Sequence, residues 1–311
     1  MMPSFNVERS IEIDAPPEAV YNTIVDYESW TKWSPWLCAE PDAVVTVPEN
    51  SNSIGSIYSW EGQIVGVGEI EHVKLQPGRR IDDEIRFTKP FKSKSNVAFD
   101  VQPSGQGAKL SWIMDGSLPW FMFWMKSMMQ TFIGMDYERG LKMIKELVET
   151  GKINSQTKVL DKQEVGPFHI AGLRRRCSLS EIGPSMQAAM GELGPLWAKH
   201  NLPPGGELIS VYHKFNLKAQ TCDYTIGWSL PSKDVAVESP LETWSCPHTT
   251  ALCVEHLGDY NHLGNGWSAA NQYVRYKGLK QSRISPFEIY TNDPRETPID
   301  QWCTKIYFPL K

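Results

Sequence analysis

Polar and apolar residues alternate near the start of the chain. Along residues 7–14, Val7, Ile11 and Ile13 share one face, which predicts a half-buried strand. Residues 17–24 then predict a short helix with a proline and an acid in its first turn. Several β-like runs follow between about 43 and 115, separated by turn signals. This order predicts a mostly antiparallel sheet.

A helical pattern replaces the strand pattern after Pro119 and predicts one long helix to about Glu149. Apolar residues recur along it at helical intervals, which is typical of a helix with one buried face. They are Met128, Phe132, Met135, Leu141, Ile144 and Leu147. A long helix after a run of antiparallel strands indicates a curved sheet that grips the helix.

The second half of the chain, after a polar bridge at 150–156, contains a repeat. The first unit predicts a strand over 159–177, a helix over 181–200, and strands over 207–215 and 222–230. The second unit predicts a strand over 249–257, a helix over 262–277, and strands over 287–291 and 302–310. Two such strand-helix-strand-strand units predict a pseudo-two-fold domain with a cleft between its halves.

Composition and charge narrow the function classes. A length of 311 residues predicts two domains, and the net charge of −5 argues against a nucleic-acid partner. The six cysteines lie far apart, and no histidine spacing is typical of a metal site, so neither a metal nor a cofactor is expected. Gly62, Gly66 and Gly68 lack a following helix and indicate a curved strand more than a nucleotide loop. The acids at 82–84 are expected at a solvated turn.

Membrane association is not expected from the sequence. The N-terminus is charged and alternating, unlike a signal peptide. The most lipophilic stretch, residues 118–125, is much shorter than a membrane span and is followed by Lys126. A cytoplasmic protein is therefore predicted, and no protein partner is indicated.

Four short sequence motifs lie in the first half of the chain. They are I-x-I-D-A-P-P-E-x-V-Y at 11–21, W-S-P-W at 33–36, W-E-G at 60–62, and D-Y-E-R-G-L-K at 136–142. On the basis of these motifs, residues 5–150 resemble the START-like (SRPBCC, polyketide-cyclase-like) superfamily. The resemblance implies a helix-grip domain over 1–152 but says very little about activity. Tryptophans are frequent there, and they either fill a core or line a second, apolar cavity. They are Trp30, Trp33, Trp36, Trp60, Trp112, Trp120 and Trp124.

Three further sequence motifs lie in the second repeat unit. They are H-L-G-D-Y at 256–260, P-F-E-I-Y at 286–290 with Asp293-Pro294 after it, and T-K-I-Y-F-P-L-K at 304–311. On the basis of these motifs, residues 157–311 resemble the GyrI-like small-molecule-binding module, the AraC-type effector-binding domain. The resemblance implies a duplicated βαββ domain, so the whole chain is expected to be α+β. In the looser first unit, Ser210 stands where Glu288 stands, and Tyr212 matches Tyr290.

Glu288 is the main candidate for function. It lies in an apolar strand between Phe287 and Ile289, where an unpaired carboxylate is costly to bury. The alternative is a solvated strand face, because strand residues alternate sides. The resemblance implies that this glutamate receives cationic or polarised ligands in an aromatic cleft, where rings add cation–π attraction. The residues expected to line the cleft, each with core packing as the alternative, are Tyr290, Tyr212, Trp228, Tyr260, Trp197 and Trp267.

Two functions follow from this candidate site. The leading hypothesis is a multidrug-type binding protein for a hydrophobic, cationic small molecule. It is not expected to be a DNA-binding regulator, because a START-like domain stands in place of a helix-turn-helix domain. The alternative is a hydrolase of strained, electrophilic ring compounds, with Glu288 as general base and Tyr290 or Tyr260 as proton donor. The sequence leaves open whether the protein is an enzyme.

Overall fold

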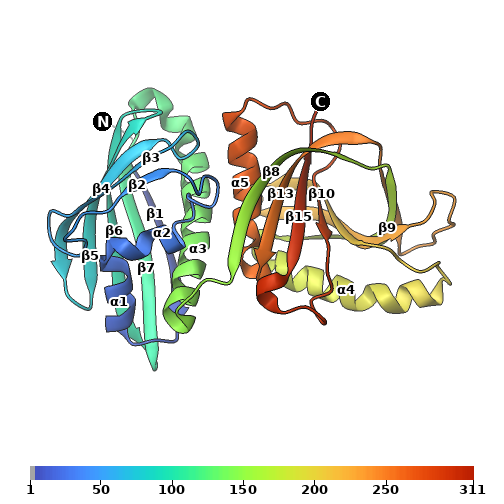
Figure 1. Cartoon of the computed structure of the whole chain (residues 1–311), viewed down its shortest axis with the longest axis horizontal. Coiled ribbons are helices and arrows are strands. Elements are labelled where there is room, and N and C mark those ends of the chain that lie inside the picture. The colour runs from blue at the N-terminus through green and yellow to red at the C-terminus, as the bar shows by residue number, and fades with distance from the viewer. Residues whose placement is uncertain (1–3) are drawn as a thin grey trace. The chain divides into compact units, whose positions relative to one another are not determined.

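A computed structural model describes residues 4–311, except for the side chain of Met122, as two compact units (Figure 1). One unit runs to Asn154 and includes Tyr260–Asn265, and the other comprises Ser155–Asp259 and Gly266–Lys311. Each contains one antiparallel sheet and its helices, so the predicted α+β class is confirmed. Among the described residues, no helix combines the length and the apolar character needed to cross a bilayer.

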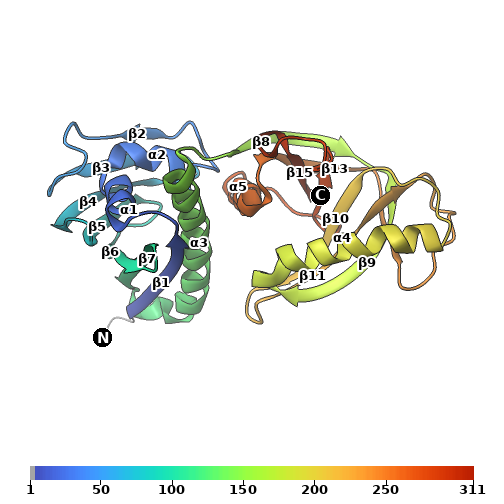
Figure 2. The ribbon, with the colours of Figure 1, turned by 90° about the horizontal axis from the view of Figure 1, so that it is seen from below.

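The N-terminal unit is a seven-stranded sheet with the order β1-β7-β6-β5-β4-β3-β2. Its strands are β1 (Ser4–Ile13), β2 (Val44–Thr46), β3 (Ile57–Glu61), β4 (Val67–Gln76), β5 (Arg80–Lys89), β6 (Ser93–Ser104) and β7 (Gly107–Ser117). Its helices are α1 (Pro17–Val25), η1 (Tyr27–Ser29), α2 (Trp30–Trp33), η2 (Trp120–Met125) and α3 (Lys126–Thr150). The long helix α3 packs against this sheet, as predicted for a helix-grip fold (Figures 1 and 2).

Most of the N-terminal tryptophans fill the core. Trp112 on β7 stacks on Tyr137 of α3, with ring centroids 4.0 Å apart, and meets Trp33 edge-on at 5.6 Å. Trp30 and Trp33 are buried in the same cluster, and Trp36 and Trp60 pack against it partly exposed. By contrast, Trp120 and Trp124 are exposed. Packing is therefore the structural role of the buried set.

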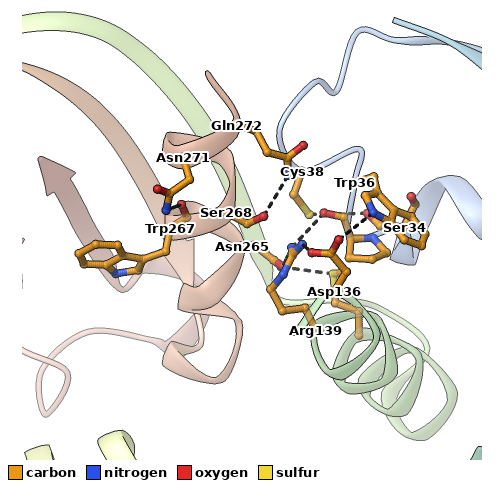
Figure 3. Close-up of polar contacts among 12 residues, drawn as sticks. Ser34, Trp36, Cys38, Asp136, Arg139, Asn265, Trp267, Ser268, Asn271 and Gln272 are labelled. Carbon is orange, nitrogen blue, oxygen red and sulfur yellow. Dashed lines mark hydrogen bonds and ion pairs between the residues drawn. The ribbon is translucent and has the colours of Figure 1, made fainter. Parts of the chain in front are cut away.

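Two of the sequence motifs, W-S-P-W and D-Y-E-R-G-L-K, contact each other at the edge of this core. The Trp36 indole N–H donates to Asp136 Oδ2 at 3.0 Å, and Asp136 pairs with Arg139 at 2.5 Å (Figure 3). Arg139 also donates to the Pro35 carbonyl oxygen at 2.9 Å. These contacts join the W-S-P-W segment to α3.

The predicted apolar face of α3 is only half correct. Leu141 and Ile144 are buried under the sheet, but Met128, Phe132 and Met135 are exposed. Met129 and Ile133, in the same turns of α3, pack against the core, so Met128, Phe132 and Met135 lie on the helix face that points away from the sheet. The predicted apolar positions therefore belong to two different faces of the helix, of which only one is buried.

The acids at 82–84 are not all solvated, which corrects the sequence expectation. Asp83 is buried, and its Oδ1 lies 2.6 Å from Nδ1 of buried His72. The other ring nitrogen of His72 lies 2.9 Å from the Val25 carbonyl oxygen, and the ring stacks on Tyr27. Burial raises the pKa of the Asp83 carboxyl, although the hydrogen bond with His72 opposes this shift.

The C-terminal unit is an eight-stranded sheet with the order β12-β9-β11-β10-β14-β15-β13-β8. Its strands are β8 (Ser155–Val165), β9 (Phe168–Ser178), β10 (Leu208–Asn216), β11 (Thr221–Leu230), β12 (Glu242–Cys246), β13 (Thr249–Gly258), β14 (Phe287–Tyr290) and β15 (Cys303–Pro309). Its helices are η3 (Leu179–Glu181), α4 (Ile182–Lys199), α5 (Leu263–Tyr276) and η5 (Ile299–Gln301); η4 (Tyr260–His262) precedes α5. The duplicated βαββ arrangement is confirmed, with β10 and β14 as the central pair.

Each repeat contains one more strand than predicted. The run over 159–177 is two strands, β8 and β9, because the chain turns at Gly166. Gly166 has φ +81°, and a side chain there would meet the Pro247 carbonyl oxygen. The extra strands are exchanged, since β8 pairs with β13 of the second repeat and β12 pairs with β9 of the first.

Candidate functional site at Glu288

Glu288 lies in the central strand pair of the C-terminal sheet. Within the short strand β14, Phe287 and Ile289 point to one face and join a buried apolar cluster. Glu288 and Tyr290 point to the opposite face, as the alternation in the sequence predicts. Glu288 is 0% exposed, so the alternative of a solvated strand face is wrong.

Three neutral donors surround the Glu288 carboxylate. The hydroxyl groups of Tyr212 and Tyr290 donate to Oε2 at 2.8 and 2.7 Å. The indole N–H of Trp267, on α5, donates to Oε1. The structure thus brings together four of the residues predicted for this site, from β10, β14 and α5.

The pseudo-two-fold axis of the domain passes beside this carboxylate. Strands β10 and β14 are antiparallel, and Ser210 is the direct partner of Glu288. Tyr212 and Tyr290 each lie two residues further along their own strand, so the two tyrosines are related by the pseudo-symmetry. A carboxylate at both positions would place two like charges side by side, which raises the free energy of the ionised pair. The serine in the first repeat avoids this repulsion and leaves a single acid near the axis.

Aromatic rings enclose the donors. Tyr212 meets Trp267 edge-on with ring centroids 4.6 Å apart, and Phe215 stacks on Tyr212 at 5.3 Å. The sulfur of Met186, on α4, lies 3.9 Å from both tyrosine hydroxyls. One helix of each repeat therefore covers the same face of the sheet at Glu288; α4 is seen beside the strands in Figure 2.

Phe215 and Met186 were not among the predicted residues. Simple alternation from Tyr212 would place Phe215 on the opposite face of β10. A bulge between Tyr212 and Lys214 shifts the register, so Phe215 pairs with Cys222 and returns to the face of Tyr212. The bulge could have been predicted only from the residue types around His213, and none of these is specific for a bulge. Met186 lies on a helix whose register was not assigned from the sequence.

The electrostatics of the site are dominated by burial. Desolvation raises the pKa of the Glu288 carboxyl, and the hydrogen bonds from Trp267, Tyr290 and Tyr212 oppose this shift without cancelling it. The pKa of the Tyr212 hydroxyl is raised well above its ordinary value, first by burial and then by the charge of Glu288. Within residues 4–311, no lysine, arginine or histidine forms an ion pair with Glu288. The acid is therefore held by dipoles alone.

This raised pKa predicts a pH dependence of stability. Because the folded-state pKa of Glu288 lies above its unfolded value of about 4.3, folding takes up a proton between the two values. The stabilisation that comes from this proton is therefore fully present at pH values below the unfolded pKa. It is lost as the pH rises through the folded pKa. Glu288→Gln removes the titration, so its stability relative to wild type should rise with pH and then level off. Urea unfolding of both proteins across a pH series measures this difference, and a difference constant with pH would contradict the prediction.

The other predicted site residues lie elsewhere or have a structural role. Trp228 and Trp197 contact each other edge-on at 5.2 Å, and Trp197 donates to the Pro203 carbonyl oxygen. Trp228 is on the same face as Tyr290, since both pair with Leu208, but Trp197 is eleven residues beyond Met186, about 16 Å along α4. Tyr260 begins η4, which belongs to the N-terminal compact unit.

His256 and the possibility of a metal site complete the survey. His256 is buried, and its Nε2 lies 3.1 Å from the Asp259 carbonyl oxygen, which fits a structural role at the end of β13. In the part of the chain that the structure describes, no three His, Cys, Asp or Glu side chains gather as a metal site would require. The chemistry available around Glu288 is therefore that of a buried acid, phenols and an indole.

Several solved structures each match about half of the chain. Protein CV1439 from Chromobacterium violaceum is 23% identical over 47% of this chain and 98% of its own, with a TM-score of 0.37. The Aha1 dimer from Colwellia psychrerythraea is 16% identical over 48% of this chain and 98% of its own, with a TM-score of 0.37. The EcmrR C-terminal domain is 18% identical over 51% of this chain and 99% of its own, with a TM-score of 0.41. No curated protein matches the chain significantly.

Two family matches cover nearly all of the chain in tandem. Residues 4–149 match the family described as polyketide cyclase / dehydrase and lipid transport. Residues 160–311 match the GyrI-like small molecule binding domain. Both resemblances expected from the sequence are confirmed. The chain thus contains a polyketide cyclase / dehydrase and lipid transport domain followed by a GyrI-like small-molecule-binding domain.

Proposed function

We propose that the C-terminal domain binds a hydrophobic, cationic small molecule at Glu288. The observation that carries this proposal is a fully buried carboxylate whose partners are all neutral. A buried acid without a counter-charge is costly, and an organic cation would supply that charge. The surrounding rings of Tyr212, Trp267 and Phe215 would add cation–π attraction of about 0.5–2 kcal/mol each.

Ligand entry requires a rearrangement of the donors. Because Glu288 is closed off from solvent, at least one of the three donors must move before a cation can contact the carboxylate. Trp267 and Tyr290 are only partly buried, whereas Tyr212 is buried and stacked on Phe215. Movement of Trp267 or Tyr290 would therefore cost less packing than movement of Tyr212.

Calorimetry with a matched pair of probes tests the proposal. 1-Methyl-4-phenylpyridinium is a cation, and 4-methylbiphenyl has nearly the same shape without charge. Glu288→Gln keeps the shape of the side chain, and its amide can accept from Trp267 and donate to the tyrosines. We expect the variant to bind the cation about ten- to a hundredfold more weakly, since a charge-assisted contact of about 1.5–3 kcal/mol is lost, and to bind the neutral probe as wild type does.

Two outcomes of this experiment count against the proposal. Equal losses for both probes would mean that Glu288 shapes the site without recognising charge. Absence of binding to wild type would show that this cation class is not received at all. Ser210→Ala is a matched control, because it changes the pseudo-symmetric neighbour of Glu288 and leaves the carboxylate in place.

The hydrolase alternative uses the same carboxylate and is separated by the fate of the ligand. A binding protein returns its ligand unchanged, whereas a hydrolase forms a product that mass spectrometry detects after incubation. If Glu288 is a general base, Glu288→Gln lowers the rate of turnover more than the affinity. The geometry offers two phenols beside the acid but also closes the acid to water, so it favours binding.

A further inference from the structure

An exposed aromatic surface lies at one end of the N-terminal sheet, outside the functional site. Its apolar residues come from η2, from the outward face of the first turns of α3 and from the turn between β5 and β6. They are Phe91, Trp120, Phe121, Phe123, Trp124, Met128, Phe132 and Met135. We call them the aromatic end. Phe123 and Trp124 are 65% and 66% exposed, values that are high for side chains of this size.

The register of the sheet brings these segments together. Ser95 of β6 pairs with Gly116, one residue before β7 ends, and Ser4 of β1 pairs with Ser117. The β5–β6 turn at 90–92 and η2 therefore emerge from the same end of the sheet. This is also the end at which the chain begins in Figures 1 and 2. The exposed apolar residues of the turn and of η2 therefore lie at the same end of the sheet.

Lysines border the aromatic end. Lys89, Lys92 and Lys126 form no ion pair within the described residues, and Lys94 pairs with Glu84. The nearest acid on β7 is Asp115, whose hydrogen-bond donor Asn6 is neutral, so these three lysines outnumber one acid. The edge of the surface thus carries a local positive charge on a chain whose net charge is −5.

We propose that the aromatic end docks onto a membrane surface that contains anionic lipids. Tryptophan and phenylalanine beside lysine are the side chains that favour the interface between headgroups and acyl chains. A second copy of the chain fits less well, because an isologous contact would oppose the same lysines, and lysine is depleted in the core of protein interfaces. The short apolar stretch argued against a membrane partner because it cannot span a bilayer, but a docking surface needs no span.

Vesicle sedimentation of the full chain tests this proposal. Wild type should sediment with phosphatidylcholine vesicles that contain about one third phosphatidylserine, and much less with pure phosphatidylcholine. Phe123→Glu with Trp124→Glu should lower the partition coefficient by at least about tenfold, because two buried rings are lost from the interface. Neutralising Lys92 and Lys126 to Gln should lower it by about fivefold each, and added salt should act in the same direction.

The control is Ile54→Glu, since Ile54 is also 65% exposed but lies in the loop between β2 and β3. This variant should bind vesicles as wild type does, and unchanged melting temperatures show that all variants fold. The proposal is overturned if wild type ignores anionic vesicles, or if it binds neutral vesicles equally well. It is also overturned if ultracentrifugation shows a dimer that the Phe123/Trp124 variant dissociates, because the surface would then join two copies.

Discussion

Trp267→Ala should lower the free energy of unfolding of the C-terminal domain by about 3–5 kcal/mol. The indole contacts Tyr212 and lies 5.2 Å from the ring of Phe308, so truncation leaves a cavity between α5 and the sheet. It also removes one of the three donors to a carboxylate that has no exposure to water. Chemical denaturation, followed by circular dichroism, measures the loss.

Trp267→Phe separates the two contributions. Phenylalanine fills most of the ring volume but lacks the N–H, so we expect a smaller loss of about 1–3 kcal/mol from the unsatisfied acceptor. Trp228→Phe is a matched control, since it shortens another partly buried indole on the same face without changing the donors to Glu288. If the Trp267 and Trp228 variants lose the same small amount, the indole–carboxylate bond does not stabilise the fold.

The second large effect is expected in the N-terminal domain, where Trp112→Ala should cost about 3–5 kcal/mol. The ring is buried between Tyr137 and Trp33, and its N–H has no hydrogen-bond partner among the described residues. The loss is therefore one of packing alone. Trp120→Ala removes a tryptophan that is 73% exposed and should change stability by less than about 0.5 kcal/mol.

Scanning calorimetry of the Trp112 variant also tests the proposed domain division at 1–152 and 157–311. If the domains unfold independently, two transitions should be resolved and only one should move to lower temperature. The Trp267 variant should move the other. A joint shift of both transitions in either variant would contradict independent folding.

The geometry of the candidate site at Glu288 could be predicted from the sequence because it depends on local rules. Alternation within β14 places Glu288 and Tyr290 on one face, and the repeat relates Tyr212 to Tyr290. Both rules need only the order of residues along strands. Trp267 was a candidate as an aromatic residue on the helix of the second repeat, although its contact with the carboxylate could not be derived from helical periodicity alone.

The parts that the sequence did not reveal depend on tertiary structure. Phe215 reaches the site through a bulge that no residue type specifies. Asp83 looked solvated because it lies among acids, and its burial follows from His72 on the neighbouring strand. The apolar residues of α3 looked like one face, but Met135 and Leu141 are six residues apart, so the exposed set at the start of the helix and the buried set lie on different faces.

The exchange of β8 and β12 between the two repeats has a consequence for synthesis on the ribosome. The first repeat emerges with β8 lacking its partner, because β13 belongs to the second repeat. Likewise β9 has only β11 until β12 has been made. The nascent first repeat thus presents open strand edges, which are the usual starting points of aggregation. A chain truncated before β13 should therefore be a client of chaperones, because it lacks the partner of β8.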